Sequence, residues 1–297
     1  VCLSEWDVGE RRHRIRDFLR FALVNRGTTL LPMAQRGSRM RSLIRRGWLS
    51  NEHGAWVMTA LPIAVGICTL KPQPIQFLLL AAWTAAYCSY HALTLYMAAA
   101  PQRRKTYLPA MATWAAIAAV CGIPVIILHP RPVARILIPV TIFCAIATFE
   151  AWRKRRRSLP SHIASVLASS CTYPLSVWVI AEDYSPLKLW CAAAAIAAYM
   201  LGATLYVRSL IRGAGDTRMF VVCIAWHLAT LVAGLVGVVT HVVPLWSLIA
   251  FTLLSARAII VPALQNSSRI KLRPAVIGIG EYLACVLMFS AVMAIVA

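Results

Sequence analysis

The chain has 297 residues, of which 60% are hydrophobic and only 13% are charged, and its formal net charge is +20. Soluble proteins have about a quarter of their residues charged, so this composition excludes an ordinary soluble fold and predicts an all-α bundle of transmembrane helices. Aromatic and basic residues do not alternate in any loop, which argues against nucleic acid as the partner of the positive charge.

The first 50 residues contain eleven arginines and precede the first apolar run. An arginine-rich segment beside a membrane is attracted to the anionic cytoplasmic leaflet. We therefore interpret residues 1–50 as a cytoplasmic extension and residues 51–297 as the transmembrane domain. A chain that starts at Met40 is expected to insert and fold in the same way.

About nine apolar windows follow, each long enough to cross roughly 30 Å of hydrocarbon as a helix. Prolines between the windows mark loops and first turns, where proline is tolerated. Prolines within the runs, such as Pro62 and Pro174, predict kinks. The expected spans are 54–70, 75–98, 107–128, 132–150, 161–181, 186–207, 219–240, 243–262 and 275–296.

The basic residues are divided very unequally between the two sides of these spans. The N-terminal segment and the connections after alternate spans carry 26 of the 30 lysines and arginines. Because positive residues accumulate on the cytoplasmic side of a membrane, this division predicts an N-terminus inside and a C-terminus outside. The opposite side has only Lys71, Arg131, Arg135 and Lys188.

Ionisable residues within the spans lie near the predicted cytoplasmic end. At 1.5 Å per residue, His91, His227 and Glu281 each lie roughly 10–14 Å inside that end. Charged groups at membrane depth usually face a bundle interior or a wet cavity, so we predict one polar cavity open to the cytoplasm. Its predicted residues are Glu52, His53, His91, Arg208, His227 and Glu281.

A second interpretation of these residues is purely structural. The histidines can be neutral and hydrogen-bonded to neighbouring helices, and Glu281 can be protonated or paired with an arginine. At the start of the first span, Asn51 can cap the helix, Glu52 can complement its dipole, and Trp56 can lie at the interface.

Four stretches carry a family resemblance. The first opens the first span: Asn51-Glu52-His53-Gly54-Ala55-Trp56. The others are Arg155-Arg156-Arg157-Ser158-Leu159, Leu205-Tyr206-Val207-Arg208-Ser209-Leu210-Ile211-Arg212 and Gly278-Ile279-Gly280-Glu281. Over about residues 50–297 the chain resembles the YwiC-like family of bacterial integral membrane proteins. The resemblance implies a multi-pass protein of the bacterial inner membrane and implies no particular activity.

Three classes of function are compatible with a cytoplasmic polar cavity. The first is binding of a lipid-like or small anionic ligand, with membrane lipids around the protein. The second is a small-solute or proton-coupled carrier, in which His91, His227 and Glu281 relay protons. The third is a binding or assembly protein that serves another membrane complex.

An enzymatic alternative is a degenerate prenyltransferase. Nine helices with such a cavity resemble the UbiA-type enzymes, whose aspartate-rich loops hold magnesium and a prenyl diphosphate. The chain has no Asp or Glu between His53 and Phe149, and its nine cysteines stand singly. We therefore expect no metal and no cofactor.

Overall fold

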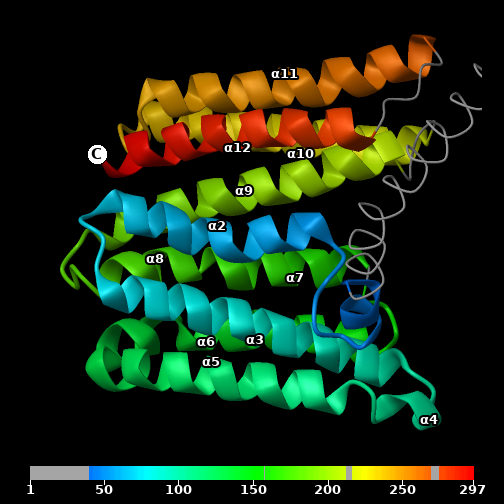
Figure 1. The fold of residues 1–297 in the computed structure, drawn as a ribbon. Coiled ribbons are helices and arrows are strands. Elements are labelled where there is room, and N and C mark those ends of the chain that lie inside the picture. Colours follow the sequence, from blue (N-terminus) through cyan, green and yellow to red (C-terminus); the bar gives the residue numbers. More distant parts are fainter. Residues whose placement is uncertain (1–39, 157, 212–215, 269–273) are drawn as a thin grey trace, which may run out of the picture.

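The computed structural model describes residues 40–156, 158–211, 216–268 and 274–297, and in these residues the chain is all-α. Each of the nine predicted windows falls on a helical stretch (Figure 1). The labelled helices are α2 (His53–Thr69), α3 (Pro74–Ala98), α4 (Pro101–Arg104), α5 (Leu108–Leu128), α6 (Pro130–Trp152), α7 (Leu159–Ser170), α8 (Thr172–Trp178), α9 (Pro186–Ile211), α10 (Thr217–Val239), α11 (Leu245–Ser268) and α12 (Pro274–Val296).

Seven of the described helices are long and apolar enough to cross a membrane: α3, α5, α6, α9, α10, α11 and α12. The structure thus has the architecture of a multi-pass membrane protein. The other two predicted windows differ from this group. Helix α2 has 17 residues, and the window predicted at 161–181 is divided into α7 and α8, with Cys171 between them.

Pro174 explains the division of this window. Proline lacks an N–H, and its ring clashes with the carbonyl four residues earlier, which here belongs to Ser170. Helix α7 ends at Ser170. Pro62, by contrast, lies inside α2 without ending it.

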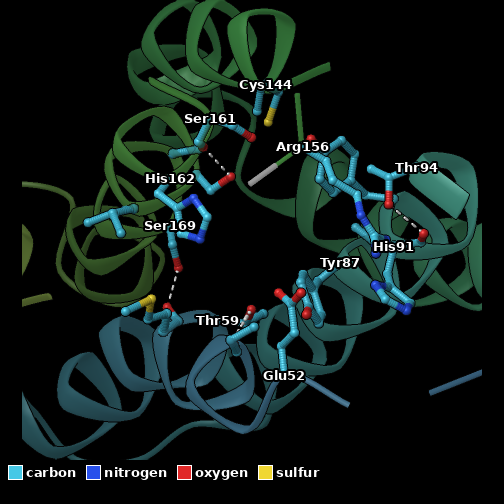
Figure 2. Close-up of a pocket in the computed structure, with 18 of the residues that line it drawn as sticks. Glu52, Thr59, Tyr87, His91, Thr94, Cys144, Arg156, Ser161, His162 and Ser169 are labelled. Atoms are coloured by element: carbon cyan, nitrogen blue, oxygen red, sulfur yellow. Dashed lines mark hydrogen bonds between the residues drawn. The ribbon is translucent and has the colours of Figure 1, made fainter. Parts of the chain in front are cut away.

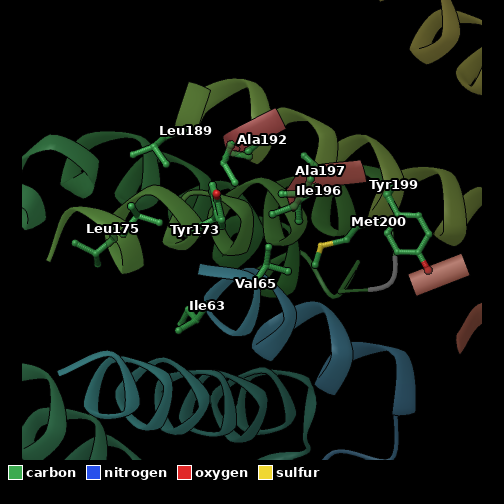
Figure 3. Packing of buried hydrophobic residues seen from close by; sticks show 14 of the residues in the cluster. Ile63, Val65, Tyr173, Leu175, Leu189, Ala192, Ile196, Ala197, Tyr199 and Met200 are labelled. Carbon is green, nitrogen blue, oxygen red and sulfur yellow. The ribbon is translucent and has the colours of Figure 1, made fainter. Parts of the chain in front are cut away.

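The helices form two groups that meet at α9 (Figure 1). Helices α2, α3 and α5–α8 pack with one another, α10, α11 and α12 form the other group, and α9 contacts α7 and α8 as well as α10 and α12. Ile63 of α2, Tyr173 of α8 and Ile196 and Met200 of α9 are almost completely buried where the groups meet (Figure 3). A run of alanines in α9 lets the neighbouring backbones approach closely.

A buried amide joins three helices at one end of the first group. Gln76 of α3 is completely buried, and its Nε2 donates to the carbonyl of Ser176 at 2.8 Å and to that of Gly66 at 3.3 Å. A Cβ at Gly66 would lie 1.7 Å from Ser176 Oγ. Only glycine allows α2 and α8 to approach so closely here.

The segment before α2 is held against the bundle. The indole N–H of Trp114 in α5 donates to the carbonyl of Trp48 at 3.0 Å, and the indole of Trp56 donates to that of Ser50 at 3.1 Å. The prediction that Asn51 caps α2 is wrong. Glu52 occupies the N-cap position of α2, and its side chain makes no cap hydrogen bond. The Glu52 N–H donates instead to Ser50 Oγ.

Candidate functional site

A pocket of about 230 Å³ lies between α2, α3, α6 and α7 (Figure 2). It lies at the end of the bundle where α2 and α7 begin and where α3 and α6 end, the end predicted to face the cytoplasm. Its acidic and basic residues are Glu52, His91, Arg156 and His162. We call this space the polar pocket.

Helical spacing explains how α3 and α7 supply one wall each. Residues three or four positions apart share one face of a helix. On α3 this places Trp83, Tyr87 and His91 on the pocket, and Tyr90 and Thr94 continue the same face. On α7, the pocket face is a row of serines at four-residue intervals: Ser161, Ser165 and Ser169.

Local contacts fix the orientation of several of these side chains. The Tyr87 ring meets that of Trp56 edge-on at a centroid distance of 5.8 Å and lies 6.4 Å from that of His91. His162 Nδ1 lies 2.8 Å from the carbonyl of Ser158. A carbonyl only accepts, so Nδ1 carries a proton and donates it to the Ser158 carbonyl.

The structure brings two of the six predicted site residues together in this pocket, Glu52 and His91. Arg208 lies in the last turn of α9, outside the lining of the polar pocket. The side chain of His53 lies outside the described residues.

His227 belongs to a different helix contact. It is 6% exposed, and its Nδ1 lies 2.8 Å from the carbonyl of Cys223, one turn earlier in α10. Its Nε2 faces Gly202 of α9, where an added Cβ would lie 3.0 Å away. His227 therefore packs between α10 and α9.

Glu281 belongs to a third place, between α11 and α12. Its carboxylate lies 2.8 Å from Nη1 of Arg257, which also donates to the carbonyl of Gly280. The Arg257 guanidinium lies 4.3 Å from the centroid of the Tyr206 ring. The prediction that His91, His227 and Glu281 share one cavity is therefore wrong, because only His91 lines the polar pocket. For Glu281 the structural interpretation holds, since its carboxylate is paired with an arginine.

Two charged or basic pocket residues, Arg156 and His162, were not among the six predicted site residues, although the sequence places His162 near the same end of the spans. Arg156 stands within a run of five basic residues, which the positive-inside rule already explains. The four-residue spacing of Ser161, Ser165 and Ser169 was the available signal, because it marks a hydroxyl-bearing face on an otherwise apolar helix. Within the part of the chain that the structure describes, no group of three or more His, Cys, Asp or Glu residues could hold a metal ion.

Comparison with known proteins finds a family match that covers the polar pocket. Residues 49–177 match the family model described as YwiC-like protein, and all residues that line the polar pocket fall within that range. A Haemophilus influenzae protein described as "Uncharacterized protein" is 25% identical over 181 residues, which cover 61% of this chain and 74% of that protein. No solved structure matches. The family match confirms the resemblance for residues 49–177, which are similar to the YwiC-like family.

Proposed function

We propose that this protein binds a lipid-like or small anionic molecule in the polar pocket, which opens to the cytoplasm of a bacterium from within the inner membrane. The observation that carries the proposal is the convergence of Glu52, His91, Arg156 and His162 on one space of about 230 Å³. Ionisable groups among membrane helices are costly and mark functional sites.

The pocket suits a molecule that is polar at one end and apolar at the other. Arg156 precedes α7, and its guanidinium can donate two parallel hydrogen bonds to a phosphate or carboxylate. Met58, Trp83 and Val166 supply apolar lining among the helices. A volume below the roughly 300–1,000 Å³ typical of drug-sized ligands favours a headgroup or another small molecule.

The topology that we propose has nine spans, with the N-terminus inside and the C-terminus outside. In addition to the seven long helices, α2 and the pair α7–α8 would cross the membrane. Support comes from the charge division, since Arg104 and Arg153 follow α3 and α6 at the end of the bundle where the pocket lies. Residues 1–50 would be a cytoplasmic extension of the transmembrane domain 51–297.

Native mass spectrometry of the full chain, purified in mild detergent, tests the binding proposal. We expect a retained lipid or small anion that is lost in Arg156→Gln and kept in the matched control Arg131→Gln, because Arg131 lies exposed in the first turn of α6 at the other end of the bundle. If both variants retain the lipid or anion equally, the polar pocket is not the binding site.

A small-solute or proton carrier is the second candidate, favoured by the break between α7 and α8. Carriers place discontinuous helices at their transport sites. Around the break, Ser169 of the pocket lining is buried together with Ser170 and Thr172, and Ser170 Oγ has no hydrogen-bond partner among the described residues. Proteoliposomes with an internal pH dye test this alternative: a proton flux above that of empty vesicles would favour the carrier.

The prenyltransferase alternative gains no comparable support. Glu52 is the single carboxylate among the described residues that line the pocket, and a magnesium diphosphate site needs several oxygen ligands from the protein.

A further inference from the structure

Four of the hydroxyl groups that line the polar pocket turn their protons away from it. Thr59 Oγ1 donates to the carbonyl of Ala55 at 2.7 Å, and Thr94 Oγ1 donates to that of His91 at 2.8 Å. Ser165 Oγ donates to its own helix, and Ser169 Oγ donates at 2.6 Å to a carbonyl of α2. A hydroxyl has one proton, so these four groups offer a ligand only their lone pairs.

Two further groups of the lining, Glu52 and His162, add acceptors, while His91 and Arg156 supply N–H donors. An ionised Glu52 carboxylate only accepts hydrogen bonds, and His162 uses its Nδ1 proton on the carbonyl of Ser158. Trp83 and Tyr87 add aromatic rings, whose faces attract cations. Carboxylate, hydroxyl lone pairs and aromatic faces together form the environment that a protonated amine requires.

We propose that the ligand of the polar pocket is a zwitterion that carries a primary ammonium beside its anionic group. The ammonium contacts Glu52, the α7 hydroxyls and the aromatic rings, and the phosphate or carboxylate contacts Arg156. This inference rests on the proposed function and names the class of its ligand: an aminoalkyl phosphate, either free or as the headgroup of a phosphatidylethanolamine. Each charge of such a ligand meets an opposite charge of the pocket, which lowers the cost of removing both from water.

The first experiment measures binding of soluble probes to the full chain in detergent by calorimetry. The probes are phosphoethanolamine, which has both charges, glycerol 3-phosphate, which lacks the amine, and ethanolamine, which lacks the phosphate. Loss of a charge-assisted hydrogen bond weakens binding roughly tenfold or more. We therefore expect phosphoethanolamine to bind at least about tenfold more tightly than either other probe.

Glu52→Gln identifies the ammonium side of the pocket. This variant should bind phosphoethanolamine and glycerol 3-phosphate equally. Glu182→Gln makes the same change at an exposed residue outside the pocket, and it should still bind phosphoethanolamine more tightly than glycerol 3-phosphate. Thr59→Val provides an independent variant, because it removes one acceptor and keeps the shape of the side chain. Thr59→Val should partly reduce the preference for phosphoethanolamine over glycerol 3-phosphate. A melting curve for each variant confirms that it is folded.

A second experiment distinguishes a free aminoalkyl phosphate from the headgroup of a phosphatidylethanolamine. The protein is placed in nanodiscs of mixed phosphatidylethanolamine and phosphatidylglycerol, and the lipids that remain after detergent extraction are identified. Enrichment of phosphatidylethanolamine, lost in Glu52→Gln, identifies a lipid headgroup; binding of free phosphoethanolamine without lipid enrichment identifies a soluble ligand.

The outcomes separate this inference from the proposed function. If glycerol 3-phosphate binds as tightly as phosphoethanolamine, the ammonium contact is refuted and the anion site remains. If ethanolamine alone binds as tightly as phosphoethanolamine, the anion contact is refuted and the zwitterion with it. If no probe binds and no lipid is enriched, both proposals fail.

Discussion

Arg257 and Glu281 form an ion pair with an N–O distance of 2.8 Å between two apolar helices, α11 and α12. Their side chains are 18% and 21% exposed, and Arg257 also lies over the ring of Tyr206. The residues are 24 positions apart in the chain, so the pair fixes the register of one helix against the other.

Glu281→Gln should destabilise the protein strongly, because it leaves the Arg257 charge without its partner. Removal of one member of a buried pair costs about 3–5 kcal/mol. The measurement is the midpoint of thermal unfolding in detergent, compared with Glu182→Gln. Glu182 pairs with Arg135 at 3.4 Å in an exposed position, where a pair contributes about 0–1 kcal/mol. Similar midpoints for the two variants would show that the Arg257 pair is not needed for stability.

Gly66→Ala should also destabilise the protein, for a steric reason. The new Cβ would lie 1.7 Å from Ser176 Oγ, and overpacking of this kind costs about 1–3 kcal/mol. The double variant Gly66→Ala with Ser176→Gly removes the clashing side chain and should recover much of the loss. Gly278→Ala is the matched control, since a Cβ there meets no atom within 4 Å. No recovery in the double variant would contradict the clash.

Truncation should separate the first 39 residues from the segment that follows. A chain that starts at Met40 keeps the hydrogen bond between Trp48 and Trp114 and that between Ser50 and Trp56, so we expect it to insert and unfold like the full chain. A chain that starts at Asn51 loses both and should unfold at a lower temperature. The comparison is made at equal synthesis in membranes, and loss of the Met40 chain would show that residues 1–39 are structural.

The sequence predicted the positions of the long helices well and the contacts between helices poorly. Residue counts at 1.5 Å per residue gave similar depths for His91, His227 and Glu281. Depth does not determine which side of a helix a residue faces or which helix lies next to it. His227 therefore packs against Gly202, and Glu281 against Arg257, away from His91.

Some features of the candidate site could be recognised from the sequence and others could not. Glu52 and His91 could be recognised because ionisable residues are rare in apolar runs. Arg156 could not be recognised, because the sequence does not show which of the five basic residues before α7 lines the pocket. Pro174 predicted a kink in the window 161–181, and the structure has a break at Cys171 there, because the proline ring displaces the carbonyl of Ser170.

Reporter fusions test the proposed nine-span topology. Truncations fused after Lys105 and Lys154 should read cytoplasmic, and those after Lys71, Asp183 and Ala297 should read external, because basic residues hold their loops inside. The fusions after Lys71 and Asp183 are the most informative, since they follow α2 and α8, the two shorter segments. A cytoplasmic reading at Ala297 would rule out nine spans.

Access to the polar pocket from the cytoplasm can be measured with thiol labelling. In a variant whose native cysteines are replaced, Ser165→Cys adds one thiol to an exposed position on the pocket face of α7. A membrane-impermeant maleimide should label it in inside-out vesicles and not in right-side-out vesicles, because the pocket lies where α2 and α7 begin. Ser176→Cys is the control, since Ser176 is completely buried in α8 and should remain unlabelled in both. Labelling of Ser165→Cys only in right-side-out vesicles would place the opening of the pocket on the external face. That result would contradict the proposed orientation even if the helices cross the membrane as we propose.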